Sequence, residues 1–237
     1  MTTAFHSKYW AHELTLRGAT GSIESLSRSI AGARVDLNPH QVDAALFALR
    51  SPLTRGTVLA DEVGLGKTIE AGIVIAQRWA ERKRRILLIV PATLRKQWQQ
   101  ELDSKFYLPM AILDSKVYNE LTDAGNSNPF DLADRLIVCS YHFASAKAQE
   151  ISRIPWDLVV IDEAHRLRNV FRKSSKLARK VVDAVAQAPK LLLTATPLQN
   201  SLMELYGLAS VIDVHIFGDA ASFRDQFVRA ADERIRN

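Results

Sequence analysis

Five short apolar runs recur along the chain after residue 35. Each is too short for a helix, rich in branched residues, and apolar at successive rather than alternate positions. This pattern is typical of strands that are covered on both faces, as in parallel sheets. The runs occupy residues 57–60, 86–90, 136–140, 158–161 and 191–193.

Between the apolar runs, hydrophobic residues recur at every fourth position, which lines one face of a helix. Strands that alternate with helices predict an α/β fold, with a doubly wound parallel sheet and helices on both faces. In such sheets ligands bind beyond the carboxyl ends of the strands. The two clearest helical sets are Leu94, Trp98, Leu102 and Phe106, and Leu177, Val181 and Val185.

The patterns divide the chain into two parts. Residues 1–34 predict an N-terminal helical extension, and residues 35–237 predict the α/β domain. Residues 107–134 include Gly-Asn-Ser-Asn-Pro and predict an exposed loop. After Pro197 the pattern is helical again, through Leu202, Leu205, Ala209 and Ile212 and then Phe223 and Phe227.

Composition narrows the class of protein without naming it. Of the 237 residues, 47% are apolar and 24% charged, as expected of a protein with a real core. No apolar run approaches the roughly 20 residues of a membrane span, and the first residues lack a secretory signal pattern. The one cysteine, Cys139, is expected to be a small buried hydrophobe. A cytoplasmic protein is therefore expected. The net charge of +5 favours an anionic partner, with nucleic acid first and nucleotide second.

The strongest chemical signal is a glycine-bearing loop that follows the first apolar run and precedes a helical pattern. Its backbone N–H groups and the N-terminus of the next helix would hold a phosphate. Lys67 would reach the β and γ phosphates of a nucleotide, and the Thr68 hydroxyl would bind Mg²⁺. The alternative is a glycine-rich turn with an exposed lysine. The predicted nucleotide-binding loop is Asp61, Glu62, Val63, Gly64, Leu65, Gly66, Lys67 and Thr68, in which Asp61 stands where such loops usually have glycine.

A second signal is the pair Asp162 and Glu163 at the end of a buried strand. Burying charge without a partner costs several kcal/mol or more, and a metal ion held by Asp162 would offset that cost. Glu163 could then polarise an attacking water. The alternative is a helix cap with a neighbouring acid. Lys67, Asp162 and Glu163 are the predicted catalytic residues, with ATP and Mg²⁺ as the implied ligands.

Two further patterns are weaker. Thr194 and Thr196 follow the last apolar run and could hydrogen-bond the acid pair, although Thr and Pro end strands routinely. Asn38 and Pro39 form a good helix start, in which Gln41 could close a capping box. Recognition of adenine by the Gln41 amide is the functional alternative.

Taken in order, these blocks resemble those of superfamily-two helicases. The blocks are the phosphate loop, Ile-Val-Pro-Ala-Thr-Leu with Gln97-Trp98, Cys139-Ser140-Tyr141, Asp-Glu-Ala-His and Thr-Ala-Thr-Pro-Leu-Gln-Asn. The last block and the residues after it look like the Swi/Snf branch of DNA-dependent ATPases, and the phosphate loop is similar to that of its bacterial members. The resemblance covers roughly residues 35 to 230.

The resemblance implies roles that the local patterns do not show. It implies a RecA-like lobe with P-loop chemistry and adenine contact by Gln41. It also implies coupling of hydrolysis to DNA movement by His165, Thr194 and Thr196. Members of this family complete the site with a second RecA-like lobe that carries an arginine. We therefore expect this chain to be the first lobe of a longer motor, either truncated or excised.

Two basic stretches could contact nucleic acid. Residues 82–85 fit a solvated helix end, because cations favour a helix C-terminus. Residues 166–180 hold seven basic residues and no acid, and form either a solvated face or a phosphate-tracking surface. No base-reading element is visible, so the expected partner is duplex DNA bound without sequence preference. The predicted contacts are Arg172, Lys173 and Lys176, with Thr93, Arg95 and Ser140 added by the resemblance.

Three classes of function remain. The leading one is the ATP-binding lobe of a DNA-dependent ATPase that translocates on DNA, with very weak turnover as an isolated lobe. The second is a nucleotide- or DNA-binding module that does not turn over by itself. A phosphate-loop kinase is disfavoured, because no lid segment or acceptor pocket is suggested.

Overall fold

The computed structural model describes residues 26, 33–35, 38–50, 55–60, 66–172, 174–198 and 201–229. The predicted N-terminal helical extension lies almost wholly outside these residues. Residues 61–65 of the predicted phosphate loop and Lys173 also lie outside them.

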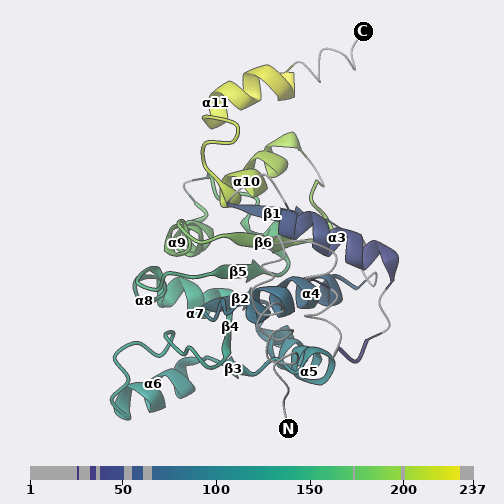
Figure 1. Cartoon of the computed structure of the whole chain (residues 1–237). Coiled ribbons are helices and arrows are strands. Elements are labelled where there is room, and N and C mark those ends of the chain that lie inside the picture. Colours follow the sequence, from purple (N-terminus) through teal and green to yellow (C-terminus); the bar gives the residue numbers. More distant parts are fainter. Residues whose placement is uncertain are drawn as a thin grey trace, which may run out of the picture.

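A sheet of six parallel strands forms the centre of the molecule (Figure 1). The sheet order is β1-β6-β5-β2-β4-β3, so consecutive strands are joined by crossovers rather than hairpins. This confirms the predicted doubly wound parallel fold. The strands are β1 Gly56–Leu59, β2 Ile86–Val90, β3 Met110–Ile112, β4 Leu136–Ser140, β5 Leu158–Ile161 and β6 Lys190–Leu193.

Helices cover both faces of the sheet, in two groups that Figure 1 shows on opposite sides. One group consists of α3 Pro39–Arg50, α4 Lys67–Ala80 and α5 Arg95–Phe106. The other includes α6 Ser115–Asp123, α7 Tyr141–Ala146, α8 Ala148–Ser152 and α9 Lys176–Ala184. Short 3₁₀ turns, η1 Ala92–Leu94 and η2 Ala164–Leu167, follow β2 and β5. The chain continues through α10 Leu202–Ile212, α11 Ala220–Phe223 and a π-helical turn, η3 Arg224–Arg229.

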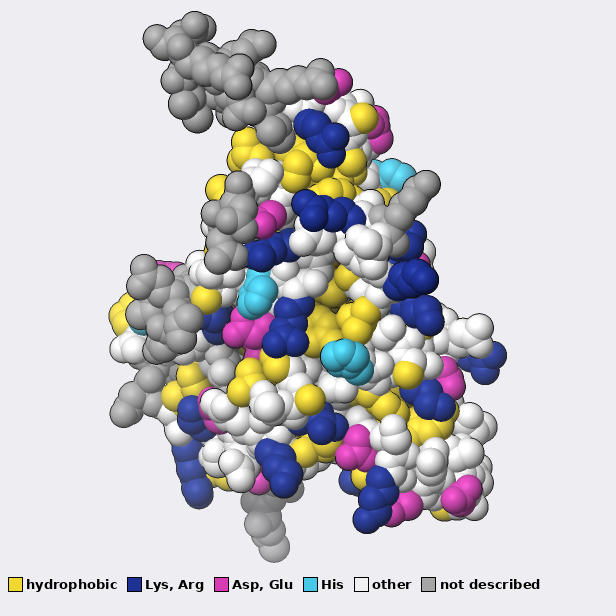
Figure 2. Space-filling model, turned by 180° about the vertical axis from the view of Figure 1, so that it is seen from behind, with side chains coloured by type: hydrophobic (Ala, Val, Ile, Leu, Met, Phe, Trp, Pro, Cys, Tyr) yellow, Lys and Arg dark blue, Asp and Glu magenta, His cyan; other side chains and the backbone are white. Residues whose placement is uncertain are grey.

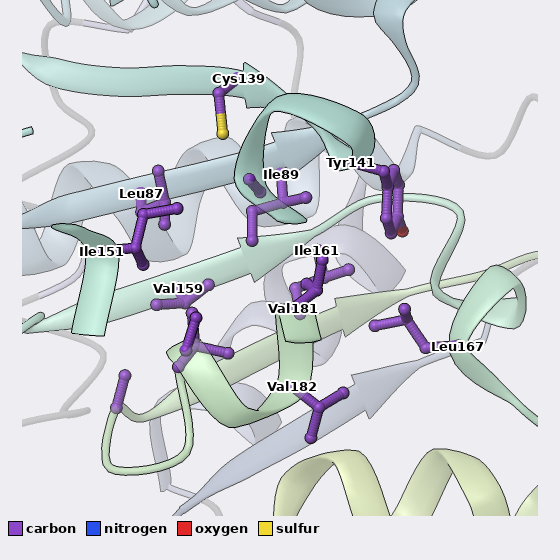
Figure 3. Close-up of a cluster of buried hydrophobic side chains, with 14 of the residues drawn as sticks. Leu87, Ile89, Cys139, Tyr141, Ile151, Val159, Ile161, Leu167, Val181 and Val182 are labelled. Carbon is purple, nitrogen blue, oxygen red and sulfur yellow. The ribbon is translucent and has the colours of Figure 1, made fainter. Parts of the chain in front are cut away.

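Because side chains alternate across a strand, each strand contributes to two separate cores. In β2, Leu87 and Ile89 pack against the α7–α9 side, shown in Figure 3, whereas Ile86, Leu88 and Val90 pack against the α3–α5 side. All five side chains are fully buried. This explains why the sequence of the strand is apolar at every position.

Residues 124–134 form no helix or strand, as expected of the loop predicted at residues 107–134, but the prediction was wrong for residues 110–123. This segment contains β3, which pairs with β4 at the edge of the sheet, and α6. The Asp114 side chain caps α6 by accepting hydrogen bonds from the N–H groups of Lys116 and Val117, at 3.0 and 3.1 Å. The strand has only three half-buried residues, so it lacked the apolar run that marked the other strands.

The predicted helical faces are mostly confirmed. Trp98, Leu102 and Phe106 are buried in α5, whereas Leu94 belongs to η1 and is only half-buried. In α10 the helix is present, but Leu205 is 38% exposed. The buried side of α10 instead includes Leu208 and Val211.

An aromatic cluster joins α10 to α11 and η3 at one end of the molecule. Tyr206 and Phe223 are buried there with ring centroids 5.1 Å apart, and Phe217 and Phe227 pack beside Phe223 while remaining partly exposed. Figure 2 shows hydrophobic side chains gathered at this end. Among the helices that the structure describes, none is long and apolar enough to cross a bilayer.

Candidate functional site

The strand order brings the ends of β1, β6 and β5 together at one edge of the sheet. Leu59 pairs with Leu193 and Ile161 pairs with Leu192, so the residues that follow these strands are neighbours. The ends of β1 and β5 are two strand spacings apart, about 10 Å. Residues far apart in the sequence, after positions 59, 161 and 193, therefore meet at the carboxyl edge.

Helix α4 begins at this edge with an arrangement suited to an anion. Gly66 precedes the helix in a left-handed conformation, with φ 96° and ψ 32°, and provides no side-chain cap. The first N–H groups of a helix that lacks such a cap point toward solvent or a ligand. Lys67 and Thr68 form the first turn, so their side chains begin beside these N–H groups.

Gln41 closes the predicted capping box and also contacts the end of the phosphate loop at Gly66. Its side-chain oxygen accepts a hydrogen bond from the Asn38 N–H at 3.2 Å, as in a capping box. Gln41 is only 5% exposed. A Cβ added to Gly66 would lie 2.2 Å from the amide nitrogen of Gln41. The amide therefore packs directly against the end of the phosphate loop, and the two interpretations of Gln41 are compatible.

The Asp162 carboxylate is buried and held at both oxygen atoms. One oxygen accepts a hydrogen bond from the indole N–H of Trp98 at 2.8 Å, and the other accepts from the N–H of Glu163 at 2.8 Å. The main-chain oxygen of Asp162 accepts a hydrogen bond from the hydroxyl of Tyr141 at 2.5 Å. The orientation of this residue is therefore fixed by the protein itself.

Burial raises the pKa of the Asp162 carboxyl above its ordinary value. The hydrogen bonds from Trp98 and from the Glu163 N–H oppose this rise, and so does the positive charge of Lys67, whereas the charge of Glu163 adds to it. A buried carboxylate of this kind is stabilised by a nearby cation. The donor set thus fits Mg²⁺, which prefers oxygen ligands and often uses one carboxylate together with substrate phosphates.

Glu163 has an unusual backbone conformation. Its φ of 53° and ψ of 45° place a residue with a Cβ in the left-handed region, which is uncommon for such residues. Glu163 Oε2 lies 3.1 Å from His165 Nδ1, although the two groups lack the alignment of a hydrogen bond. Strained residues cluster at functional sites, so this conformation agrees with a site at the end of β5.

Thr194 lies between the two halves of the site, but it does not bond to the acid pair. It is fully buried, and its N–H donates to the oxygen of Leu59 at 3.1 Å. Its hydroxyl accepts a hydrogen bond from the N–H of Thr196 at 3.2 Å. Neither threonine hydroxyl is hydrogen-bonded to Asp162 or Glu163 in the described structure.

One pocket of about 330 Å³ joins the two halves. Lys67 and Thr68 line it from α4, Asp162 and Glu163 from the end of β5, and α5 closes the remaining side. The ammonium group and the carboxylates therefore face the same space. The other lining residues are Gly66, Ile69, Leu94, Gln97, Trp98, Glu101 and Lys105.

The predicted nucleic-acid contacts after β2 and β4 lie along the same edge, because Val90 pairs with Ser140. Thr93 is exposed, whereas Arg95 is engaged by the oxygen of Ala92 at 3.1 Å and lies 3.9 Å from Asp114. Ser140 is 8% exposed, and its hydroxyl caps α7 by accepting from the Phe143 N–H. Thr93 and Arg95 follow β2, the neighbour of β5, and Ser140 ends β4, the next strand along; none of the three lines the pocket.

The two basic stretches differ in their partners. Lys83 and Arg85 pair with Asp157 and Asp131, at 3.7 and 3.0 Å, and Arg84 stacks on Trp79. This agrees with a structural role at the amino edge of the sheet. In the second stretch Arg168 pairs with the buried Glu204 at 3.4 Å. Lys and Arg side chains recur across the face in Figure 2, and the exposed members of the stretch are Arg166, Arg172, Lys176, Arg179 and Lys180.

Two residues that hold Asp162 were not among the predicted site residues. Trp98 was named as part of a helical face and of the Gln97-Trp98 block, and Tyr141 only as part of the Cys139-Ser140-Tyr141 block. A buried indole N–H or tyrosine hydroxyl usually needs a hydrogen-bond partner, and this was the available signal. The partner itself follows only from the fold, since Trp98 and Asp162 are 64 positions apart.

The fold and the pocket define a RecA-like ATPase lobe. The chain belongs to the SNF2-related domain family, whose model matches residues 39–236. This confirms the resemblance to the Swi/Snf family, of which the chain is a first lobe.

Bacterial RapA proteins are similar to this chain in sequence. The RNA polymerase-associated protein RapA of Pectobacterium carotovorum is 39% identical over 199 residues, and that of Erwinia tasmaniensis is 38% identical over 200. These matches cover 81% and 82% of this chain but only 20% of each relative, so the chain spans about a fifth of their length.

Solved structures agree on the fold. The Sulfolobus solfataricus SWI2/SNF2 ATPase core in complex with dsDNA matches with a TM-score of 0.69 at 22% identity, over 85% of this chain and 41% of that one. The ATPase core domain from the same organism gives a TM-score of 0.66, also at 22% identity, over 85% of this chain and 40% of that one.

Proposed function

We propose that this chain is the ATP-binding lobe of a DNA-dependent ATPase that couples hydrolysis to translocation along DNA. The observation that carries the proposal is the shared pocket of Lys67 and the Asp162–Glu163 pair. Family membership supports nucleotide chemistry at this pocket.

The predicted site residues have distinct tasks in this proposal. The N–H groups at the start of α4 and the ammonium of Lys67 bind the phosphates, and the Gln41 amide contacts adenine. Thr68 and Asp162 would hold Mg²⁺, which supplies charge neutralisation at the phosphates. Glu163 orients the attacking water and accepts its proton. His165, Thr194 and Thr196 relay the state of this site to the DNA-binding surface.

Duplex DNA is the proposed partner. A structural neighbour was solved in complex with dsDNA, and the named RapA relatives are RNA polymerase-associated proteins. In this chain, exposed Arg172 and Lys176 follow the acid pair and would contact phosphates, as would Lys173, Thr93, Arg95 and Ser140. Contacts of this kind position DNA without selecting a sequence.

A second RecA-like lobe is proposed to complete the site. In related systems an arginine supplied by a partner contributes about 10³–10⁵ in rate. These 237 residues alone should therefore hydrolyse ATP very slowly and with little stimulation by DNA. Robust DNA-stimulated turnover by this chain alone would contradict the need for a second lobe.

The test of the site separates binding from hydrolysis. Binding of a fluorescent ATP analogue and single-turnover hydrolysis of ATP are measured for Lys67→Ala and Glu163→Gln. Lys67→Ala should lose binding, whereas Glu163→Gln should bind normally and not hydrolyse. Lys116→Ala and Glu120→Gln are the controls, because both side chains lie on the exposed side of α6 and pair with each other across 3.9 Å. Wild-type hydrolysis by Glu163→Gln would reject the assigned role.

The DNA partner is tested by the salt dependence of binding to a duplex of arbitrary sequence. Arg172→Ala with Lys176→Ala should weaken binding and reduce the slope of log affinity against log salt by about two. Arg82→Ala is the control, since Arg82 is exposed after α4, at the opposite edge of the sheet. An unchanged slope would exclude this surface.

A further inference from the structure

The Asp162–Glu163 peptide is held by two aromatic side chains from different elements. Trp98 donates to the carboxylate of Asp162, and Tyr141 donates to its main-chain oxygen. Trp98 lies in α5, one turn from its start, and Tyr141 is the first residue of α7. The two donors therefore reach the end of β5 from the helices that follow its neighbour β2 and the next strand, β4.

Both aromatic side chains are themselves fixed. Trp98 is 3% exposed and belongs to the core between the sheet and α3–α5. Tyr141 is also 3% exposed and belongs to the core on the opposite face. Figure 3 shows Tyr141 beyond the ends of the strands, on the side of Leu167. Buried, well-packed donors lose little freedom when they bond, so they can act as rigid supports.

Glu163 needs such support because of its backbone. A left-handed residue with a Cβ persists only where the surroundings enforce it. The oxygen that Tyr141 bonds belongs to the peptide group that also carries the Glu163 N–H, and this N–H donates to Asp162. Fixing the oxygen therefore sets the plane of the peptide and the direction in which the Glu163 side chain leaves it.

We propose that Trp98 and Tyr141 are positioning residues that clamp the Asp162–Glu163 peptide from the two faces of the sheet. Trp98 orients the carboxylate of Asp162, and Tyr141 holds Glu163 in its left-handed conformation. The inference rests on the proposed ATPase function of this site, and it assigns the two aromatic residues no contact with nucleotide.

Trp98→Phe and Tyr141→Phe test the clamp, because each removes a hydrogen-bond donor and keeps an aromatic ring. The chain offers matched controls. Trp156 is buried and donates its indole N–H to the oxygen of Ile151 at 2.9 Å, and Tyr206 is buried and donates to the oxygen of Gly218 at 3.0 Å. Trp156→Phe and Tyr206→Phe thus remove comparable bonds away from the pocket.

Three quantities are measured in the full chain for all four variants: the single-turnover rate of ATP hydrolysis, the affinity for a fluorescent ATP analogue, and the melting temperature. Trp98→Phe and Tyr141→Phe should lower the rate by up to about 10²-fold while leaving the affinity unchanged. The two controls should lower the melting temperature by a few degrees and leave the rate unchanged.

A merely structural role predicts a different result. If Trp98→Phe and Tyr141→Phe lower the melting temperature but keep the wild-type rate, the clamp is refuted. It is also refuted if the controls slow hydrolysis as much. If Trp98→Phe does not fold, Tyr141→Phe carries the test, since it removes only one oxygen atom.

Glu163→Gln distinguishes failure of the clamp from failure of the proposed function. If Glu163→Gln abolishes hydrolysis and both clamp variants keep it, only the positioning role is wrong. If Glu163→Gln keeps hydrolysis, the proposed function is wrong and the clamp is overturned with it.

Discussion

Replacing Gly66 by alanine should damage both the fold and nucleotide binding, for two separable reasons. The first is the backbone, because φ at Gly66 is 96°, where residues with a Cβ are strained. The second is steric, because the new Cβ would lie 2.2 Å from the Gln41 amide nitrogen. Gln41 is buried, so it has little space into which to move.

Both effects lower the free energy of unfolding. A left-handed conformation costs an alanine about 1–2 kcal/mol. To restore ordinary contact the Gln41 amide would have to retreat by roughly 1 Å, which would break its hydrogen bond with the Asn38 N–H. Losing that capping interaction costs about 1 kcal/mol. We therefore expect Gly66→Ala to lower the free energy of unfolding by about 2–3 kcal/mol.

Gly125 provides a matched control. Its φ of 91° is nearly that of Gly66, but an added Cβ would meet nothing within 4 Å. Gly125→Ala should therefore show the backbone cost alone. Urea unfolding measures both variants, and binding of a fluorescent ATP analogue is measured alongside. Only Gly66→Ala should weaken nucleotide binding.

A double-mutant cycle with Gln41→Ala isolates the steric part. With the amide removed, the further cost of Gly66→Ala should fall to that of Gly125→Ala. The steric clash with Gln41 is refuted if Gly66→Ala is no more destabilising than Gly125→Ala, or if removing Gln41 leaves the cost of Gly66→Ala unchanged.

Three further predictions concern the rest of the fold. Burial, together with the charge of Arg55, lowers the pKa of Lys190 from 10.5 to about 8, whereas Asp213 opposes the shift. The unfolded chain then binds more protons between these values, so the melting temperature should rise from pH 8 to pH 10.5, and Lys190→Met should abolish the rise. Gly207→Ala places a Cβ 1.7 Å from the oxygen of Arg168, so the clash should outweigh a helix-propensity gain of about 1 kcal/mol; a higher melting temperature would refute this. Burial raises the pKa of the Cys139 thiol to about 12, so thiol reagents should label it only in the unfolded chain, as mass spectrometry would show.

The fold was predicted from strands in which every position is buried, because such strands are apolar throughout. Residues 86–90 and 158–161 are apolar throughout because both of their faces are covered. The edge strand β3 was not predicted, because its three half-buried residues form no apolar run like those of the other strands. The exposure of Leu205 could not be predicted either, because α10 is apolar around most of its circumference and its sequence does not mark the exposed face.

The part of the candidate site that could be predicted from the sequence consists of residues in short motifs with a recognisable chemical role. Lys67, Thr68, Asp162 and Glu163 could be named because their residue types and flanking strand patterns indicate nucleotide chemistry, and the structure places all four around one pocket. The expectation that the Thr194 or Thr196 hydroxyl bonds the acid pair was not met. The Thr194 hydroxyl is taken by the N–H two residues later, a contact that depends on the turn after β6.

Residue patterns along the chain were enough to predict a parallel α/β sheet with a phosphate loop and an acid pair at one edge. Periodicity and residue type are local properties, and they suffice for this. Only the tertiary structure decided that β6 lies between β1 and β5, that Gln41 packs against Gly66, and that Trp98 and Tyr141 hold Asp162. Each of these contacts joins residues that are distant in the chain, and such pairings depend on strand order and helix packing rather than on any neighbouring residue.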